Sequence, residues 1–178
     1  MLLTGAPETG TGHPSKRKRT FGWADPAEIS AAAVGRPGLD VLRDIASGVL
    51  PPPPIAALMA FELTVVEPGY TEFSFVPAEF HYSPNGSVHG GVYATLLDSA
   101  AGCAVQTLLP AGMGYTSLDL SIKFLRRLTI ETGGVRAMGT VTHFGKQTAL
   151  VEARLVNDAD RLLATATSSC LVFRQAAG

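Results

Sequence analysis

The spacing of hydrophobic residues along this 178-residue chain predicts two strands, then one long helix, then four more strands. Apolar positions that alternate with polar ones favour strands over 61–65 and 71–76, joined by a turn at 67–69. Residues 88–108 are apolar on nearly every side, which is typical of a buried helix. The Pro and Gly residues of 109–112 end this helix.

The second half of the chain continues in strands. Strict alternation over 117–124 predicts one strand with Leu118, Leu120, Ile122 and Phe124 on a single face. Three more strands are expected over 135–143, 148–156 and 162–173, with turn residues between them. One helix among six strands excludes a βαβ fold. We therefore predict an α+β fold: a mostly antiparallel sheet of five to six strands wrapped around one central helix.

The residues before the first strand have a different composition. Residues 1–36 are rich in Gly, Pro and Thr and carry the basic cluster Lys16–Arg19, which is typical of a flexible, solvated tail and less often of a targeting or nucleic-acid signal. Residues 37–54 predict a short additional helix and a proline-rich connector. The folded domain is expected over 55–175. Phe21 and Trp23 are the tail residues most suited to contact it.

Bulk properties narrow the function classes. A net charge of −1 and a pI near 6.4 argue against nucleic acid as the main partner of the folded part. No apolar run approaches the ~20 residues of a membrane span, and no charged segment precedes a signal-like apolar stretch. Cys103 and Cys170 lack CxxC spacing, so reduced thiols in a cytoplasmic protein are expected.

Candidate chemistry gathers at the start of the long helix. His89, Gly90 and Gly91 stand where backbone N–H groups have no helical acceptor, and glycine lets a ligand oxygen approach them closely. Asp98 follows in the same apolar run, where an ionised carboxylate is energetically costly unless a specific interaction compensates for its burial. A backbone donor pair and a buried acid suggest carbonyl chemistry.

These residues, together with two later segments, resemble a known family over about residues 55–174. The matching pieces are Pro84-x-Gly86-x-Val88-His89-Gly90-Gly91, Asp98, Thr116-Ser117-Leu118-Asp119 and Phe124-Leu125-Arg126-Arg127. They are similar to the hotdog-fold acyl-CoA thioesterases, and within them to the phenylacetic-acid-degradation (PaaI-type) group. The resemblance implies a hotdog fold and hydrolysis of an acyl- or aryl-acyl-CoA, with coenzyme A as part of the substrate and no other cofactor.

The resemblance also assigns roles to residues. Gly90 N–H would polarise the thioester carbonyl, Asp98 would be nucleophile or general base, and Ser117 would orient the water or the carboxylate. The family commonly has Asn where this chain has Ser83, and Asn85 stands two residues further on. The other residues expected to bind substrate are His89, Gly91, Arg126, Arg127 and Lys146, the last three through the CoA phosphates.

Helix geometry constrains how these residues cooperate. His89 and Asp98 project on opposite sides of the helix, about 13 Å apart along it, so a His–Asp dyad within one chain is disfavoured. Gly90 and Asp98 are also too far apart, about 12 Å, to serve one carbonyl. We therefore expect a homodimer with shared active sites, and the resemblance to the family implies that it is assembled as a dimer of dimers. His and Cys never fall into metal-ligand spacing, and no metal site is expected.

Three other hypotheses remain open at this point. A hotdog hydratase or dehydratase would need an acid and a base placed together. A non-catalytic acyl-CoA-binding regulator would have no need of Asp98, and a purely structural oligomer leaves both Asp98 and the glycine pair unexplained. The sequence leaves the acyl group open, with Phe80, Tyr93 and Met113 as candidates to line its pocket.

Overall fold

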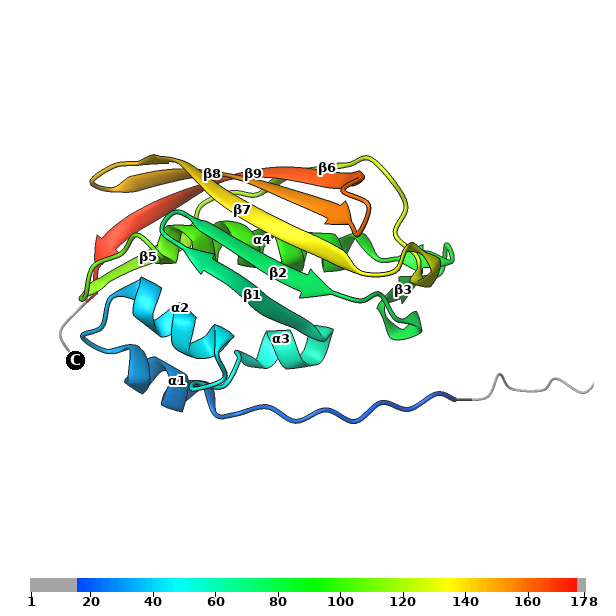
Figure 1. Cartoon of the computed structure of the whole chain (residues 1–178), viewed down its shortest axis with the longest axis horizontal. Helices are drawn as coiled ribbons and strands as arrows, with labels where there is room; N and C mark the ends of the chain where they lie inside the picture. The colour runs from blue at the N-terminus through cyan, green and yellow to red at the C-terminus, as the bar shows by residue number, and fades with distance from the viewer. Residues whose placement is uncertain (1–15, 176–178) are drawn as a thin grey trace, which may run out of the picture.

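The computed structural model describes residues 16–175, and the first fifteen residues of the expected tail lie outside that range. One curled sheet wraps a long helix (Figure 1). Its strands are β1 (Phe61–Glu67), β2 (Tyr70–Phe75), β5 (Met113–Ser117), β6 (Ser121–Phe124), β7 (Val135–Phe144), β8 (Thr148–Asn157) and β9 (Leu162–Arg174). They are all antiparallel, in the order β1-β2-β7-β8-β9-β5, with β6 also on β9.

Smaller elements surround the start of the helix. The short strands β3 (Tyr82–Ser83) and β4 (Ser87–Val88) pair with each other just before helix α4 (Gly90–Gln106). The 3-10 turns η1 (Glu79–His81) and η2 (Ile130–Thr132) lie in the connections on the same side of the molecule (Figure 1). None of the helices in the described part of the chain is long and apolar enough to cross a membrane.

The helix α4 lies against the concave face of the sheet at very short range. The Thr71 hydroxyl of β2 donates to the Ala100 carbonyl at 2.9 Å. A Cβ at Gly139 of β7 would stand 2.2 Å from that carbonyl oxygen, so only glycine fits there. The expected fold, one antiparallel sheet around one central helix, is confirmed.

The prediction of one continuous strand over 117–124 is wrong. The chain forms β5 up to Ser117, leaves the strand conformation, and resumes as β6 at Ser121, with both parts paired to β9. Over the break, Leu118 N–H donates to the Ser169 carbonyl at 2.8 Å, and the Asp119 carbonyl accepts from Ser168 Oγ at 2.7 Å. These contacts distort an edge strand that has only one neighbour, and they leave Leu118 and Phe124 each 58% exposed.

Before the sheet, three short helices replace the single one that the sequence predicts. They are α1 (Pro26–Ala33), α2 (Gly38–Ala46) and α3 (Pro54–Met59). Helix α1 falls within the segment expected to be a flexible tail. Its start is stabilised by the Asp25 carboxylate, which accepts from Ala27 N–H at 2.9 Å, and by proline at the first helical position. Pro54 likewise begins α3 where a connector was expected.

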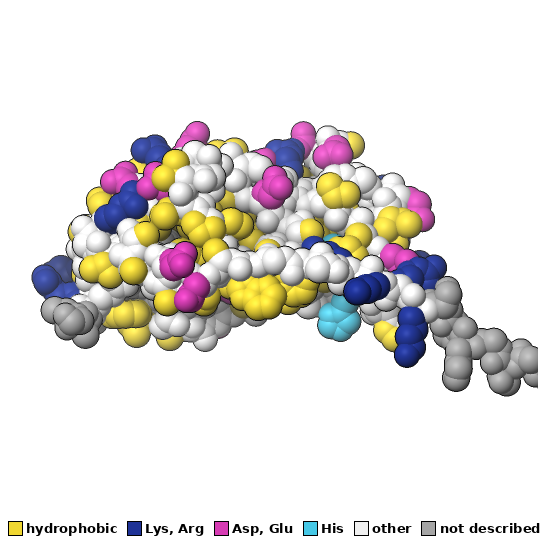
Figure 2. Space-filling model, turned by 90° about the horizontal axis from the view of Figure 1, so that it is seen from below, with side chains coloured by type: hydrophobic (Ala, Val, Ile, Leu, Met, Phe, Trp, Pro, Cys, Tyr) yellow, Lys and Arg dark blue, Asp and Glu magenta, His cyan; other side chains and the backbone are white. Residues whose placement is uncertain are grey.

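The three helices lie on the side of α4 that the sheet leaves open (Figure 1). Seen from that side, hydrophobic side chains gather over the middle of the molecule, and basic side chains stand where the described chain begins (Figure 2). The tail's Phe21 and Trp23 contact each other, with ring centroids 5.5 Å apart, and Trp23 stays 62% exposed.

Candidate active site

The start of α4 has one free backbone donor. His89 is the N-cap residue, and its Nδ1 accepts from the Gly91 N–H at 2.9 Å. The His89 carbonyl accepts from Val92 N–H, also at 2.9 Å. Within residues 16–175 no acceptor meets the Gly90 N–H. This amide combines an unpaired donor with the positive end of the helix dipole, so it suits a developing negative charge.

The two glycines serve different purposes. A Cβ at Gly91 would stand 3.0 Å from His89 Nδ1, so a side chain there would disturb the imidazole that caps the helix. A Cβ at Gly90 would meet only the Phe124 ring, at 3.4 Å. Gly91 therefore makes room for the cap, while Gly90 leaves its amide accessible. The His89 ring is occupied with this local bond and does not meet Asp98.

A groove of about 410 Å³ opens beside the Gly90 amide, and we name it the Gly90 groove. It is lined by Ser83, Asn85, Ser87, Val88, Gly90, Tyr93, Phe124, Leu125, Arg126 and Arg127. Arg126 donates to the Leu162 carbonyl at 2.5 Å, and Arg127 donates to the Gly86 carbonyl at 3.1 Å. Both guanidinium groups are thereby held at the groove while they keep donors for an anionic ligand.

Asp98 lies two turns further along α4 and does not line the Gly90 groove. It accepts a hydrogen bond from Ser117 Oγ at 3.1 Å, across the space between the helix and the end of β5. Both residues are exposed in the single chain. The expectation of a buried Asp98 is therefore corrected: it lies on the face of α4 that the sheet does not cover.

The predicted site residues thus fall into two clusters. One holds Ser83, Asn85, Gly90, Arg126 and Arg127 in one groove, and the other is the pair of Asp98 and Ser117. Gly90 and Asp98 are about 12 Å apart along α4, which is too far for both to act on one reacting carbonyl. Lys146, in the turn between β7 and β8, joins neither cluster in the single chain.

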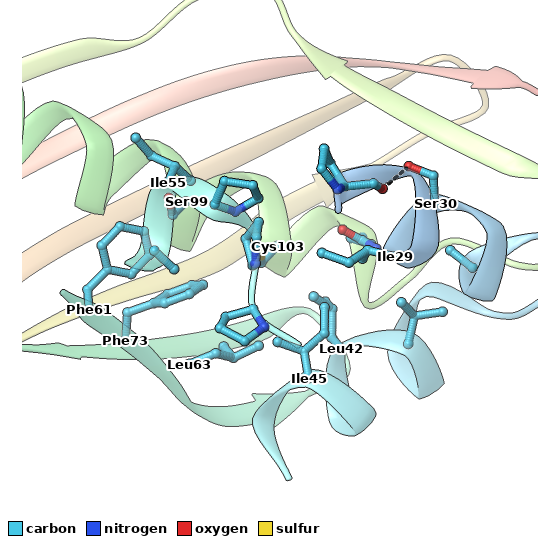
Figure 3. A pocket seen from close by; sticks show the side chains of 18 of the residues that line it. Ile29, Ser30, Leu42, Ile45, Ile55, Phe61, Leu63, Phe73, Ser99 and Cys103 are labelled. Carbon is cyan, nitrogen blue, oxygen red and sulfur yellow. Dashed lines mark hydrogen bonds between the residues drawn. The ribbon is translucent and has the colours of Figure 1, made fainter. Parts of the chain in front are cut away.

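A second cavity, of about 430 Å³, lies between α4 and the helices α1–α3, and we name it the N-terminal pocket (Figure 3). Asp98, Ser99 and Cys103 of α4 line one wall. Burial, reinforced by the Asp98 charge, raises the pKa of Cys103 to about 12, so its thiol stays protonated at neutral pH. Sequence reasoning missed this pocket, although Asp25–Pro26 is a recognisable helix start.

The residues suggested for an acyl pocket do not form one. Tyr93 lines the Gly90 groove, where its hydroxyl donates to the Arg126 carbonyl at 3.0 Å. Phe80 and Met113 line neither the groove nor the N-terminal pocket. No group of three or more His, Cys, Asp or Glu within residues 16–175 has a geometry that would hold a metal ion.

Comparison with known proteins agrees with this geometry. Residues 85–164 match the model of the thioesterase superfamily. This match covers slightly less than half of the chain. It contains the start of α4, Asp98 and Ser117, so both clusters of the candidate site, apart from Ser83, lie in the matched region. The resemblance to PaaI-type hotdog thioesterases is thereby confirmed at the level of family and fold.

Individual relatives extend the comparison. A Halobacterium salinarum protein, named as a candidate esterase, is 34% identical over 82 residues, which are 45% of this chain and 52% of the relative. The match thus spans about half the length of that relative. A thioesterase-like protein of Ralstonia eutropha, described as related to phenylacetic acid degradation, is 26% identical with a TM-score of 0.66, covering 73% of this chain and 98% of that one.

Two further solved structures share the fold. The PaaI protein of E. coli has a TM-score of 0.65 at 20% identity, covering 77% of this chain and 94% of its own. A hypothetical thioesterase of Streptococcus pneumoniae, solved with coenzyme A, has a TM-score of 0.59 at 23% identity, covering 66% and 88%. The short helices α1 and α2 and the proline-rich connector lie outside the superfamily match.

Proposed function

We propose that this protein hydrolyses acyl-CoA thioesters at active sites that two copies of the chain share. The observation that carries the proposal is the separation of the free Gly90 amide from the Asp98–Ser117 pair within one chain. Two antiparallel α4 helices related by a two-fold axis would place each N-terminus beside the middle of the other. Each site then takes Gly90 from one chain and Asp98 with Ser117 from its partner.

The chemistry follows from these groups. The Gly90 N–H donates to the thioester carbonyl oxygen and stabilises the negative charge that grows there. Asp98 either removes a proton from a water that attacks the carbonyl carbon, or attacks that carbon itself to form an anhydride that water cleaves. In both routes the carbon–sulfur bond breaks, and the departing CoA sulfur takes up a proton. Ser117 holds the carboxylate in position through the bond at 3.1 Å.

The Gly90 groove suits the polar part of the substrate. Arg126 and Arg127 line it, and guanidinium groups bind phosphate well. Lys146 would reach CoA phosphates only from a second chain. The S. pneumoniae structure with coenzyme A supports a CoA ligand for this fold. A dimer of dimers and a cytoplasmic location stay predictions.

A second donor to the carbonyl is better assigned to Asn85 than to Ser83. The Ser83 hydroxyl already donates to the Ser87 carbonyl at 3.1 Å. The Asn85 side chain is exposed on the same groove, and within residues 16–175 its amide has no hydrogen-bond partner. Asn85 therefore supports the oxyanion contact that the family commonly obtains from an Asn at the Ser83 position.

The direct test measures free thiol released from a panel of acyl-CoAs. Asp98→Asn keeps the size and most hydrogen bonding of the side chain but removes the base or nucleophile. We expect turnover to fall by on the order of 10²-fold or more, with an unchanged melting temperature. Asp40→Asn, at another exposed helical aspartate, is the control. Near-normal turnover by a folded Asp98→Asn protein would exclude the catalytic role, and acyl-CoA binding without hydrolysis would favour the regulator.

Subunit mixing tests the shared site. Gly90→Pro removes the free amide at the first helical position, where proline is well tolerated, and His89 already has the extended backbone that precedes proline (ψ 140°). Gly90→Pro and Asp98→Asn chains should each be nearly inactive alone. Their mixed dimers should recover one intact site of two. Confirmed hybrids without recovered activity would mean that each site is built within one chain.

A further inference from the structure

We propose that the N-terminal pocket binds the acyl group of the substrate, so that helices α1–α3 determine acyl specificity and favour a compact acyl or aryl group. This inference rests on the proposed function and deepens it. Its basis is the position of one apolar cavity, built largely by residues outside the superfamily match, directly beside Asp98.

The lining of the pocket suits a hydrocarbon. Apolar side chains from α1, α2, β1 and β2 point into it (Figure 3). They include Ile29, Leu42, Ile45, Phe61, Leu63 and Phe73. The rings of Phe61 and Phe73 meet edge to face with centroids 5.6 Å apart and are almost fully buried. Polar groups are confined to a few positions, among them Asp98 and Ser99 on α4.

Helix α2, which forms part of the pocket, is anchored to the domain. Gly38 N–H, at the start of α2, donates to the Leu109 carbonyl beyond the end of α4 at 3.0 Å. Val41 and Leu42 of α2 are only 2% and 3% exposed. Arg36, after α1, pairs with Asp44 of α2 at 2.6 Å. The wall of the pocket that α2 forms is therefore in place before a ligand arrives.

The position of Asp98 connects the pocket to the reaction. A carbonyl carbon must come within roughly 3–3.5 Å of the attacking atom, so the first carbons of the acyl group lie beside Asp98. The pocket begins there and continues into apolar surroundings. The partner's Gly90 groove, with its two arginines, receives the CoA end. The two cavities thus divide one substrate by polarity.

The volume of the pocket limits the acyl group. About 430 Å³ lies in the lower part of the range of roughly 300–1,000 Å³ that is usual for small-molecule sites. This space favours medium-length chains or an aromatic acid over long fatty acids. Cys103 lines the same pocket, but its protonated thiol does not compete with Asp98 as a nucleophile.

A matched pair of substitutions on one helix tests the assignment. Ala33 lines the pocket, whereas Ala31 of the same helix is exposed and does not. With the full-length protein, kcat/KM is measured for acetyl-, octanoyl- and phenylacetyl-CoA. Ala33→Phe should lower the octanoyl and phenylacetyl values by about tenfold or more and leave acetyl within about twofold, as expected for a filled apolar pocket. Ala31→Phe should behave as wild type.

An enlarging substitution provides the opposite test and does not depend on Ala33→Phe folding. Ile45→Ala widens the pocket and should shift the preference toward longer acyl chains. If the wild type is active and neither Ala33→Phe nor Ile45→Ala changes acyl selectivity, the pocket assignment is overturned and the proposed function stands. If the wild type hydrolyses none of the acyl-CoAs, the proposed function fails, and the acyl assignment fails with it.

Discussion

The two long faces of α4 differ in almost every respect. Toward the sheet, Leu96, Leu97, Ala100 and Ala104 are fully buried. On the opposite face, Asp98 is exposed, and Thr95, Ser99 and Cys103 are only partly covered. One face holds the fold together through close packing, and the other presents polar groups to a cavity. Substitutions on the sheet side of the helix should therefore change mainly the stability of the fold. Substitutions on the open side should change mainly the activity.

The largest effect is expected on the sheet side, from Gly139→Val. The first side-chain atom would stand 2.2 Å from the Ala100 carbonyl oxygen, and backbone on both sides must move to admit it. We expect a loss of about 3 kcal/mol in the free energy of unfolding, at the upper end for overpacked sites. Urea denaturation measures it. Thr140→Val, at the exposed neighbour, is the control, and equal stabilities for the two variants would contradict the close approach.

The next effect is expected on the open side, from Ser117→Ala. This change removes the hydrogen bond to Asp98 but no buried surface. We expect kcat to fall about tenfold, equivalent to about 1.4 kcal/mol, because the carboxylate loses its positioning partner. Unfolding should stay within about 0.5 kcal/mol of wild type. Ser121→Ala, exposed on β6, should change neither quantity. A stability loss without a kcat effect would place Ser117 in the packing rather than in the site.

A smaller loss of stability is expected on the sheet side of α4, from Thr71→Val. Thr71→Val keeps the shape of the side chain and removes the buried hydroxyl that donates to the Ala100 carbonyl at 2.9 Å. That carbonyl retains its bond within the helix, so the expected cost is that of one hydrogen bond, about 1 kcal/mol. Hydrolysis by the folded protein should be unchanged. A loss of kcat at full stability would show that the two faces are coupled.

The sequence could predict the features that depend on local patterns along the chain. Alternation and the apolar run over 88–108 are local periodicities of the sequence. They correctly located five strands, β1, β2, β7, β8 and β9, and the central helix α4. The motif around Gly90 is equally local. The break after Ser117 was hidden, because its cause is hydrogen bonding between Asp119 and β9, some fifty residues away. Strict alternation continued through the break and concealed it.

The open face of α4 shows a second limit. Asp98 stands among small and apolar residues, and composition alone predicts burial for it. Its exposure depends on which side the sheet wraps, which no local pattern records. The N-terminal pocket is harder still, because it brings Leu42 and Asp98 together from positions far apart in the chain. The helix start at Asp25–Pro26 was present, but the surrounding Gly- and Pro-rich composition favoured a tail.

The smallest effect on stability is expected at His81, which contacts the residue before the start of α4. Its carbonyl accepts from His89 N–H at 2.9 Å and so holds the start of α4. The ring is almost fully buried between Phe75 and Phe80, with centroids 4.8 and 4.0 Å away. Nδ1 accepts from Ala78 N–H, and Nε2 donates to the Met59 carbonyl, each at 2.9 Å. The neutral ring satisfies both partners.

Protonation of His81 should therefore weaken the fold. Burial lowers the pKa of His81 from its ordinary value of 6.5, and the charge of Arg19 acts in the same direction. As pH falls through 6.5 the unfolded chain takes up a proton that the folded chain does not, so stability decreases between pH 7 and pH 5. His81→Gln should be less stable at pH 7 but show a flatter pH dependence in urea denaturation, whereas His143→Gln, at an exposed position, should retain the wild-type slope. Equal slopes for wild type and His81→Gln would mean that the loop before α4 tolerates a charged ring, and that the start of the helix is held by His89 and Gly91 alone.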